Sequence, residues 1–195
     1  MKKCLVVFFF LLLSSCVYQR YPGIADPSIR INNVSGVSVL PPQEQGWLIP
    51  QMSLYQLTFI KQGVKQDSTY VAQVVLFKLA SFESEQSFLQ YVSQGRAAGP
   101  DTGRFETLKN KEEIFRGREV ICVKYGSVSV DKASKTQSAV RTMIMETTGY
   151  CCQHPKNKNI GVDFGYSYRH YPGDEDADFE KKAHEFLEQI RFTDF

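Results

Sequence analysis

The sequence predicts an α+β domain in which two helices pack on a largely antiparallel sheet. Residues 160–169 alternate between apolar and other side chains with the period of two that is typical of a β-strand. Residues 69–79 form a second strand-like run, and residues 179–190 place apolar side chains at helical spacing. Because strands, a helix, strands and a helix follow one another along the chain, the pattern favours an α+β arrangement.

The first part of the predicted domain contains short strands. Residues 36–40 and 46–50 are short apolar runs, and residues 54–60 alternate between apolar and polar side chains. The run at 69–79 is apolar on both faces in places, which is typical of a central strand.

A helix is expected to begin at Ser81 or Ser84, since either hydroxyl can cap it, and to end before Gly99-Pro100. Residues 101–115 are polar and carry both signs of charge. They predict a surface connection with one helical turn at residues 111–115.

The second part of the domain predicts three strands and a final helix. Residues 119–125 form a strand that could run on to Val130, and a polar loop at 131–138 separates it from a strand at 140–152. The alternating strand at 160–169 follows. The final helix begins within residues 174–178. Its apolar stripe, which we expect to dock on the sheet, consists of Phe179, Ala183, Phe186, Leu187 and Ile190.

The N-terminal residues predict a secretory signal. Met1-Lys2-Lys3 is basic, and Leu5–Leu13 is an uninterrupted run of nine apolar residues. A membrane-spanning helix needs roughly 20 apolar residues, so this run is typical of a signal peptide. Small residues then precede Cys16, and the segment resembles a lipobox, the recognition sequence of bacterial lipoprotein processing.

The lipobox resemblance implies cleavage before Cys16, a diacylglycerol on its thiol and a further acyl chain on the new amine. Two or more acyl chains anchor a protein stably. The alternative is an ordinary signal peptide with an incidental cysteine. Val17 stands where many inner-membrane lipoproteins of Gram-negative bacteria have Asp, so the resemblance implies the outer membrane, with the globular part facing the periplasm.

This processing divides the chain into three parts. Residues 1–15 are the signal peptide, residues 16–35 the lipidated N-terminus and a tether, and residues 36–195 a single α+β domain. The tether is predicted because residues 17–35 contain two prolines, one glycine and no sustained period.

The charge of the processed chain argues against a nucleic-acid partner. The full chain has 23 Lys and Arg and 21 Asp and Glu, and Lys2 and Lys3 leave with the signal peptide. The remaining 21 basic residues balance the acidic ones, so no basic bias remains. The 180 residues left from 195 are enough for one domain.

The cysteines of the domain leave two pairing states open. Of the five in the chain, Cys4 leaves with the signal and Cys16 carries the lipid, so Cys122, Cys151 and Cys152 remain. An odd number in an oxidising compartment means one bridge and one free thiol, or no bridge.

A turn near residue 135 would place Cys122 opposite residues 145–149, and a bulge at Gly149 could close the gap to Cys151 or Cys152. Adjacent cysteines on a strand point to opposite faces, so at most one of them can meet Cys122.

Cys152 and His154 carry the alternative function, a periplasmic thiol-dependent enzyme. An imidazole close to a thiol can lower the thiol pKa and create a nucleophile. No third orienting residue is identifiable, however, and the sequence has no Cys-x-x-Cys motif.

The sequence predicts neither a metal site nor a cofactor. His154 and His170 flank opposite ends of the alternating strand, about 30 Å apart, and His184 is expected on a helix surface. Residues 174–178 have the D-x-D-x-D phase of a calcium loop, but Phe179 stands where that loop needs glycine. Motifs for nucleotide binding, zinc peptidases and nucleophile elbows are missing from the sequence.

The domain resembles a group of uncharacterised Gram-negative lipoproteins. The resemblance spans about residues 36–195 and rests on Gly46-Trp47, Cys122 within its strand, Cys152-Gln153-His154-Pro155 and the strand ending Tyr166-Ser167-Tyr168-Arg169. The order of elements is also similar to the PsbP-like fold, which serves an extrinsic photosystem II protein and a nuclear-import factor that binds the GTPase Ran. The resemblance implies binding or assembly rather than catalysis. We therefore expect a non-catalytic binding or assembly module of the cell envelope, held by the lipid on Cys16 and partnered by an envelope protein.

Overall fold

The computed structural model describes residues 23–97, 103–117, 120–135 and 140–195. Within these ranges the protein is an α+β domain with one large antiparallel sheet and a helix packed on each of its faces. In chain order the elements are β1 (Gly23–Ile24), β2 (Val37–Ser38), β3 (Leu48–Met52), β4 (Gln56–Gln62), β5 (Thr69–Lys78), α1 (Glu85–Ala97), β6 (Phe105–Phe115), β7 (Cys122–Lys135), β8 (Val140–His154), β9 (Asn157–His170), α2 (Phe179–Glu188) and β10 (Arg191–Phe192).

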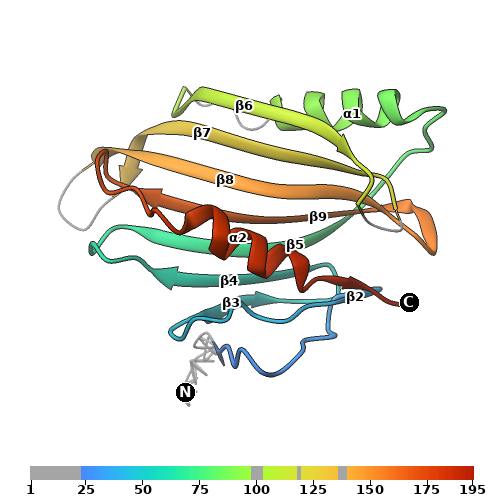
Figure 1. The fold of residues 1–195 in the computed structure, drawn as a ribbon, viewed down its shortest axis with the longest axis horizontal. Coiled ribbons are helices and arrows are strands. Elements are labelled where there is room, and N and C mark those ends of the chain that lie inside the picture. Colours follow the sequence, from blue (N-terminus) through green and yellow to red (C-terminus); the bar gives the residue numbers. More distant parts are fainter. Residues whose placement is uncertain (1–22, 98–102, 118–119, 136–139) are drawn as a thin grey trace, which may run out of the picture.

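The large sheet has the strand order β1-β3-β4-β5-β9-β8-β7-β6, and every neighbouring pair is antiparallel. The short strands β2 and β10 pair separately. Figure 1 shows α2 lying across one face of the sheet, and α1 beside β6. In this strand order β5 and β9 lie at the centre of the sheet. The central position predicted for the strand at 69–79 is therefore confirmed.

The main core lies between α2 and the sheet. The predicted alternation of β9 is confirmed, because Val162, Phe164 and Tyr166 are buried on this face. The predicted stripe of α2 is confirmed as well. Phe186 at its centre is 1% exposed, and its ring centroid lies 6.2 Å from those of both Phe59 and Tyr166.

A smaller core lies on the opposite face, under α1. The helix begins where the sequence predicts, because the Ser84 hydroxyl accepts a hydrogen bond from the Ser87 N–H at 3.1 Å. Phe88 and Val92 are the buried side chains of the helix, and they pack on Val123 of β7 and its neighbours. Because α1 has only this narrow apolar contact, it leaves part of the sheet face open.

Residues 105–115 form strand β6, so the surface connection with a helical turn predicted there is wrong. Seven consecutive residues from Phe105 are exposed because β6 is an edge strand, which explains why it lacks apolar alternation. The strand is held in the sheet by its backbone hydrogen bonds with β7, because its exposed side chains bury little apolar surface.

The polar loop predicted at 131–138 is also wrong over residues 131–135, where β7 continues. Polar side chains are buried here because they are paired. Arg104 donates two hydrogen bonds of 2.6 Å to Asp131, whose side chain is 1% exposed. Ion pairing rather than apolar burial therefore stabilises this end of the strand.

Residues 23–35 pack against the domain, although the sequence predicts a tether there. The Ala25 N–H donates to the Trp47 carbonyl at 2.9 Å, and Arg30 donates to the Gln189 carbonyl at 2.9 Å. Val34 is 1% exposed. These contacts come from irregular backbone, so they leave no periodic pattern in the sequence.

The predicted signal peptide, Cys16 and Val17 lie outside the described residues. Among the residues that the structure does describe, no helix combines the length and the apolar character needed to cross a membrane.

Candidate ligand pocket on the α1 face

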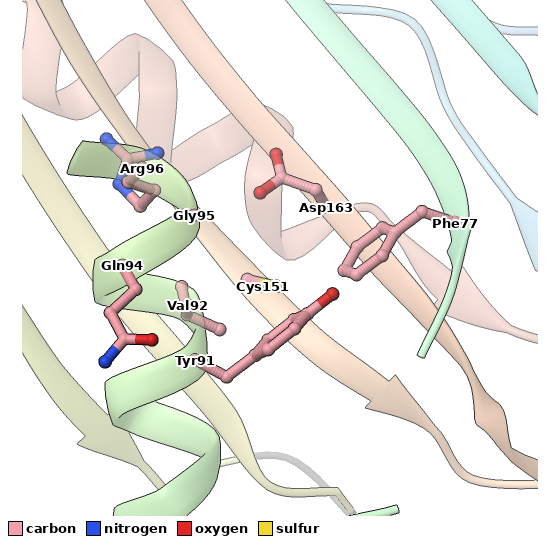
Figure 2. A pocket seen from close by; sticks show the side chains of 8 residues that line it. All are labelled: Phe77, Tyr91, Val92, Gln94, Gly95, Arg96, Cys151 and Asp163. Atoms are coloured by element: carbon pink, nitrogen blue, oxygen red, sulfur yellow. The ribbon is translucent and has the colours of Figure 1, made fainter. Parts of the chain in front are cut away.

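A pocket of about 510 Å³ lies between α1 and the open part of the sheet. This volume falls within the range of small-molecule sites, roughly 300–1,000 Å³. Figure 2 shows the side chains that line it. They are Phe77, Tyr91, Val92, Gln94, Arg96, Cys151 and Asp163, together with Gly95.

Glycines on the α1 face of the sheet lie beneath two aromatic rings next to this pocket. A Cβ at Gly161 would lie 2.2 Å from the ring of Phe77, so that ring lies directly over the glycine. Cβ atoms at Gly149 and Gly165 would lie 2.5 and 2.8 Å from the Tyr125 hydroxyl. The two rings can therefore lie close to the backbone of the sheet.

Asp163 of β9 is the buried acid of the pocket. Its Oδ1 accepts a hydrogen bond of 2.8 Å from the Tyr125 hydroxyl. By surface area the residue is half-buried, yet protein atoms surround its carboxyl group, and this burial raises the pKa of Asp163 above its ordinary value. Burial and the neighbouring Asp163 charge likewise raise the pKa of Tyr125 well above its ordinary value. The phenol therefore remains a neutral donor.

Arg96 of α1 brings a cation to the same site. Its guanidinium carbon lies 3.6 Å from the centroid of the Tyr125 ring. Its Nε lies 3.2 Å from Glu112 Oε1 without making a hydrogen bond. Ser93 and Asn110 donate hydrogen bonds to the carboxylate of Glu112 and hold it in place. Arg96 therefore faces two acids: Glu112 at ion-pair distance, and Asp163, whose pKa the Arg96 charge lowers against the larger effect of burial.

Cys151 of β8 is the free cysteine among the described residues, and it is buried in the pocket wall. Burial, together with the nearby charge of Asp163, raises the pKa of its thiol. A thiol becomes a nucleophile when its pKa is lowered. The environment of Cys151 does the opposite, so the pocket is suited to binding rather than to thiol catalysis.

The other two cysteines lie on the α2 face. Cys122 and Cys152 are direct register partners of β7 and β8, and the structure joins them in a disulfide. Of the two pairings that the sequence leaves open, the structure therefore has the one to Cys152. The β7–β8 register places this pair opposite one another without the bulge expected at Gly149.

His154 has a structural role next to this disulfide. Its ring is fully buried, its Nε2 lies 2.8 Å from the Gly36 carbonyl, and its Nδ1 accepts from the Lys156 N–H at 3.2 Å. These partners assign the proton to Nε2. With the Cys152 sulfur bonded to Cys122, the thiol–imidazole pair of the predicted enzyme is not assembled.

The acidic and imidazole groups weighed as metal ligands lie apart or have protein partners. Asp176 accepts hydrogen bonds of 2.7 Å from both Tyr70 and Lys182, and His184 is exposed on α2. Among the described residues, no three His, Cys, Asp or Glu side chains are grouped so that they could hold a metal ion.

Asp163, Tyr125 and Arg96 are not predicted as site residues from the sequence. A signal for Asp163 is present, because the acid lies between Gly161 and Gly165 on one face of the clearest strand. Two glycines that flank a polar residue on a strand face indicate that something else covers that face. No sequence pattern indicates Tyr125 or Arg96, since the contact between them depends on strand order and on the position of α1.

No protein-family model matches the chain, and no curated protein matches it. Among solved structures, the fold is similar to that of the Saccharomyces cerevisiae Ran-binding protein Mog1p. The identity is 11% and the TM-score 0.43, with 82% of this chain and 91% of that chain covered. A point-mutant form of Mog1 is similar at 11% identity and a TM-score of 0.44, with 82% and 92% covered. This likeness concerns the fold alone, and the lipoprotein resemblance stays a prediction.

Proposed function

We propose that this chain is a lipoprotein anchored in the outer membrane through Cys16, with a non-catalytic binding module that faces the periplasm. The anchor is supported by the succession of basic residues, a short apolar run and small residues before Cys16. The Cys122–Cys152 disulfide supports an oxidising compartment, because structural disulfides persist there and are rare in reducing ones.

The pocket on the α1 face is the observation that carries the binding function. Its walls are largely apolar, and a few polar groups line it from α1 and β9, held by Glu112 of β6 and Tyr125 of β7. This combination is typical of small-molecule sites. The protonated thiol of Cys151 and the disulfide at Cys152 both argue against the thiol-dependent enzyme.

A substitution at the anchor tests the location. Cys16→Ser should accumulate as an unlipidated precursor and fail to fractionate with the outer membrane. Normal maturation and outer-membrane fractionation of this variant would contradict the anchor.

A pocket-filling variant tests the binding. Gly95 lines the pocket, and a Cβ placed there has nothing within 4 Å, so Gly95→Phe narrows the pocket without a clash at the backbone. Gln90→Phe, at an exposed position of the same helix outside the pocket lining, is the matched control. Each protein is purified from envelopes, and native mass spectrometry detects small molecules that remain bound.

The wild type and Gln90→Phe should carry the same bound molecule, and Gly95→Phe should lose it. Retention of that molecule by Gly95→Phe, or an empty wild type, would contradict binding at this pocket.

A further inference from the structure

The charge balance of the pocket is incomplete when Asp163 is ionised. The charged and titratable groups around it are Arg96 and Tyr91 from α1, Glu112 from β6, Tyr125 from β7 and Cys151 from β8. Arg96 is one cation between two acids, Glu112 and Asp163, and Tyr125 and the Cys151 thiol are neutral. When Asp163 is ionised, the two acids outweigh this one cation, and the group has a net negative charge.

The Asp163 carboxyl group also has unused hydrogen-bonding capacity. Its Oδ1 accepts from Tyr125, and no described residue donates a hydrogen bond to its Oδ2. Figure 2 shows the rings of Phe77 and Tyr91 approaching one another beside Asp163, whose carboxyl group points toward the Arg96 side of the pocket. A free carboxylate bordered by aromatic rings offers a cation both an ion pair and contact with ring faces.

We propose that the pocket binds a small organic ammonium compound, with its cationic nitrogen at Asp163 and its apolar body between Phe77 and Tyr91. This inference rests on the proposed binding function and gives its ligand a chemical class. An anion is disfavoured because Arg96 already faces both Glu112 and Asp163. A purely apolar ligand would leave the Asp163 oxygen without a donor, which costs free energy.

Binding of such a cation is coupled to the ionisation of Asp163. Burial disfavours the carboxylate in the empty pocket, and an ammonium group favours it. Affinity for the amine should therefore increase as the pH rises through the pKa of Asp163, while affinity for an uncharged analogue should not change.

Three probes of one shape separate the effect of charge from that of size. 2-Phenylethylamine is a cation, 2-phenylethanol is neutral and phenylacetate is an anion at neutral pH. Each is titrated calorimetrically into the detergent-solubilised mature lipoprotein, with titrations into empty micelles subtracted. The amine should bind at least tenfold more tightly than the alcohol, and phenylacetate should bind more weakly than the alcohol.

Asp163→Asn keeps an acceptor for Tyr125 but cannot ionise. This variant should lose the tenfold preference for the amine and its pH dependence, and should retain the affinity for the alcohol. Glu180→Gln removes one exposed acid on α2 and should change neither. Phe77→Leu provides a second test that leaves Asp163 intact, and it should weaken the amine severalfold more than the alcohol.

The outcomes separate this inference from the proposed function. Equal affinity for amine and alcohol, or tightest binding of phenylacetate, would overturn the ammonium ligand and leave the pocket as a binding site. Failure of all three probes, with a Gly95→Phe-sensitive molecule still bound to the wild type, would overturn the ligand class alone. Failure of the probes with an empty wild type would overturn both.

Discussion

Tyr125 and Asp163 belong to strands that are not neighbours, yet their side chains share a hydrogen bond of 2.8 Å. Strand β8 lies between β7 and β9, and the residue of β8 directly opposite Tyr125 is Gly149, which in turn pairs with Gly165 of β9. Because neither glycine has a side chain, the phenol ring can cross the middle strand. The hydrogen bond that Asp163 accepts from Tyr125 therefore depends on Gly149 and Gly165.

Replacing Gly149 should disrupt this crossing. A Cβ at Gly149 would lie 2.5 Å from both the Phe164 carbonyl oxygen and the Tyr125 hydroxyl, whereas one at Gly126 would meet nothing closer than 3.9 Å. Gly149→Ala should lower the free energy of unfolding by about 1–3 kcal/mol, the usual range for overpacking. Denaturant unfolding measures the change, with Gly126→Ala as the matched control. Equal effects at the two glycines would contradict the crossing.

Asp163 should make the stability of the protein depend on pH. Burial raises its pKa in the folded protein above that in the unfolded chain, so the folded state holds this proton more tightly. The stability from that proton is fully present below the ordinary Asp value of 3.8 and is lost as the pH rises through the folded pKa. The unfolding free energy of the wild type minus that of Asp163→Asn should therefore fall with rising pH.

Denaturant unfolding of both proteins between about pH 4 and pH 8 measures this difference, and effects of the other acids cancel between them. A difference that rises with pH would mean that the pKa of Asp163 is lowered rather than raised.

The pairing of the cysteines predicts a definite pattern of alkylation. After denaturation without reductant, one thiol should react, since the Cys16 sulfur carries the lipid, and peptide mapping should identify it as Cys151. With reductant, three should react. Three reactive thiols without reductant would rule out the bridge. Cys122→Ser should cost about 2–4 kcal/mol of stability, since the bridge restricts the unfolded chain.

Phe186 should be the most sensitive position of α2. Its side chain is 1% exposed and contacts Phe59 and Tyr166. Phe186→Ala should cost about 3–5 kcal/mol. The neighbouring Glu185 is exposed, so Glu185→Ala should cost far less. Thermal melting compares the two variants, and an unchanged midpoint for Phe186→Ala would mean that α2 is not docked as described.

The sequence predicts those parts of the fold where one face is buried against a regular element. The alternation of β9 and the stripe of α2 have this property, and both are confirmed. Strand β6 is an edge strand stabilised by backbone pairing, so it carries no apolar period. The end of β7 buries Asp131 through Arg104, and ion pairing of this kind cannot be told from a polar loop in the sequence.

The candidate site was less predictable than the fold, because its groups meet through topology. Asp163, Tyr125 and Arg96 come from three elements that are far apart in the sequence. Cys152 and His154 are close in sequence but do not form a thiol–imidazole pair. Cys152 is joined to Cys122 by a disulfide, and His154 is hydrogen-bonded to the Gly36 carbonyl.

The ionisation of Asp163 with and without an amine tests the account most directly. Carbon-13 NMR of the carboxyl groups in the solubilised lipoprotein, with the resonance assigned by its loss in Asp163→Asn, reports this pKa. We predict a pKa above the ordinary 3.8 in the free protein and a clear decrease when 2-phenylethylamine is saturating. A pKa at or below the ordinary value in the free protein, or one that the amine leaves unchanged, would contradict it.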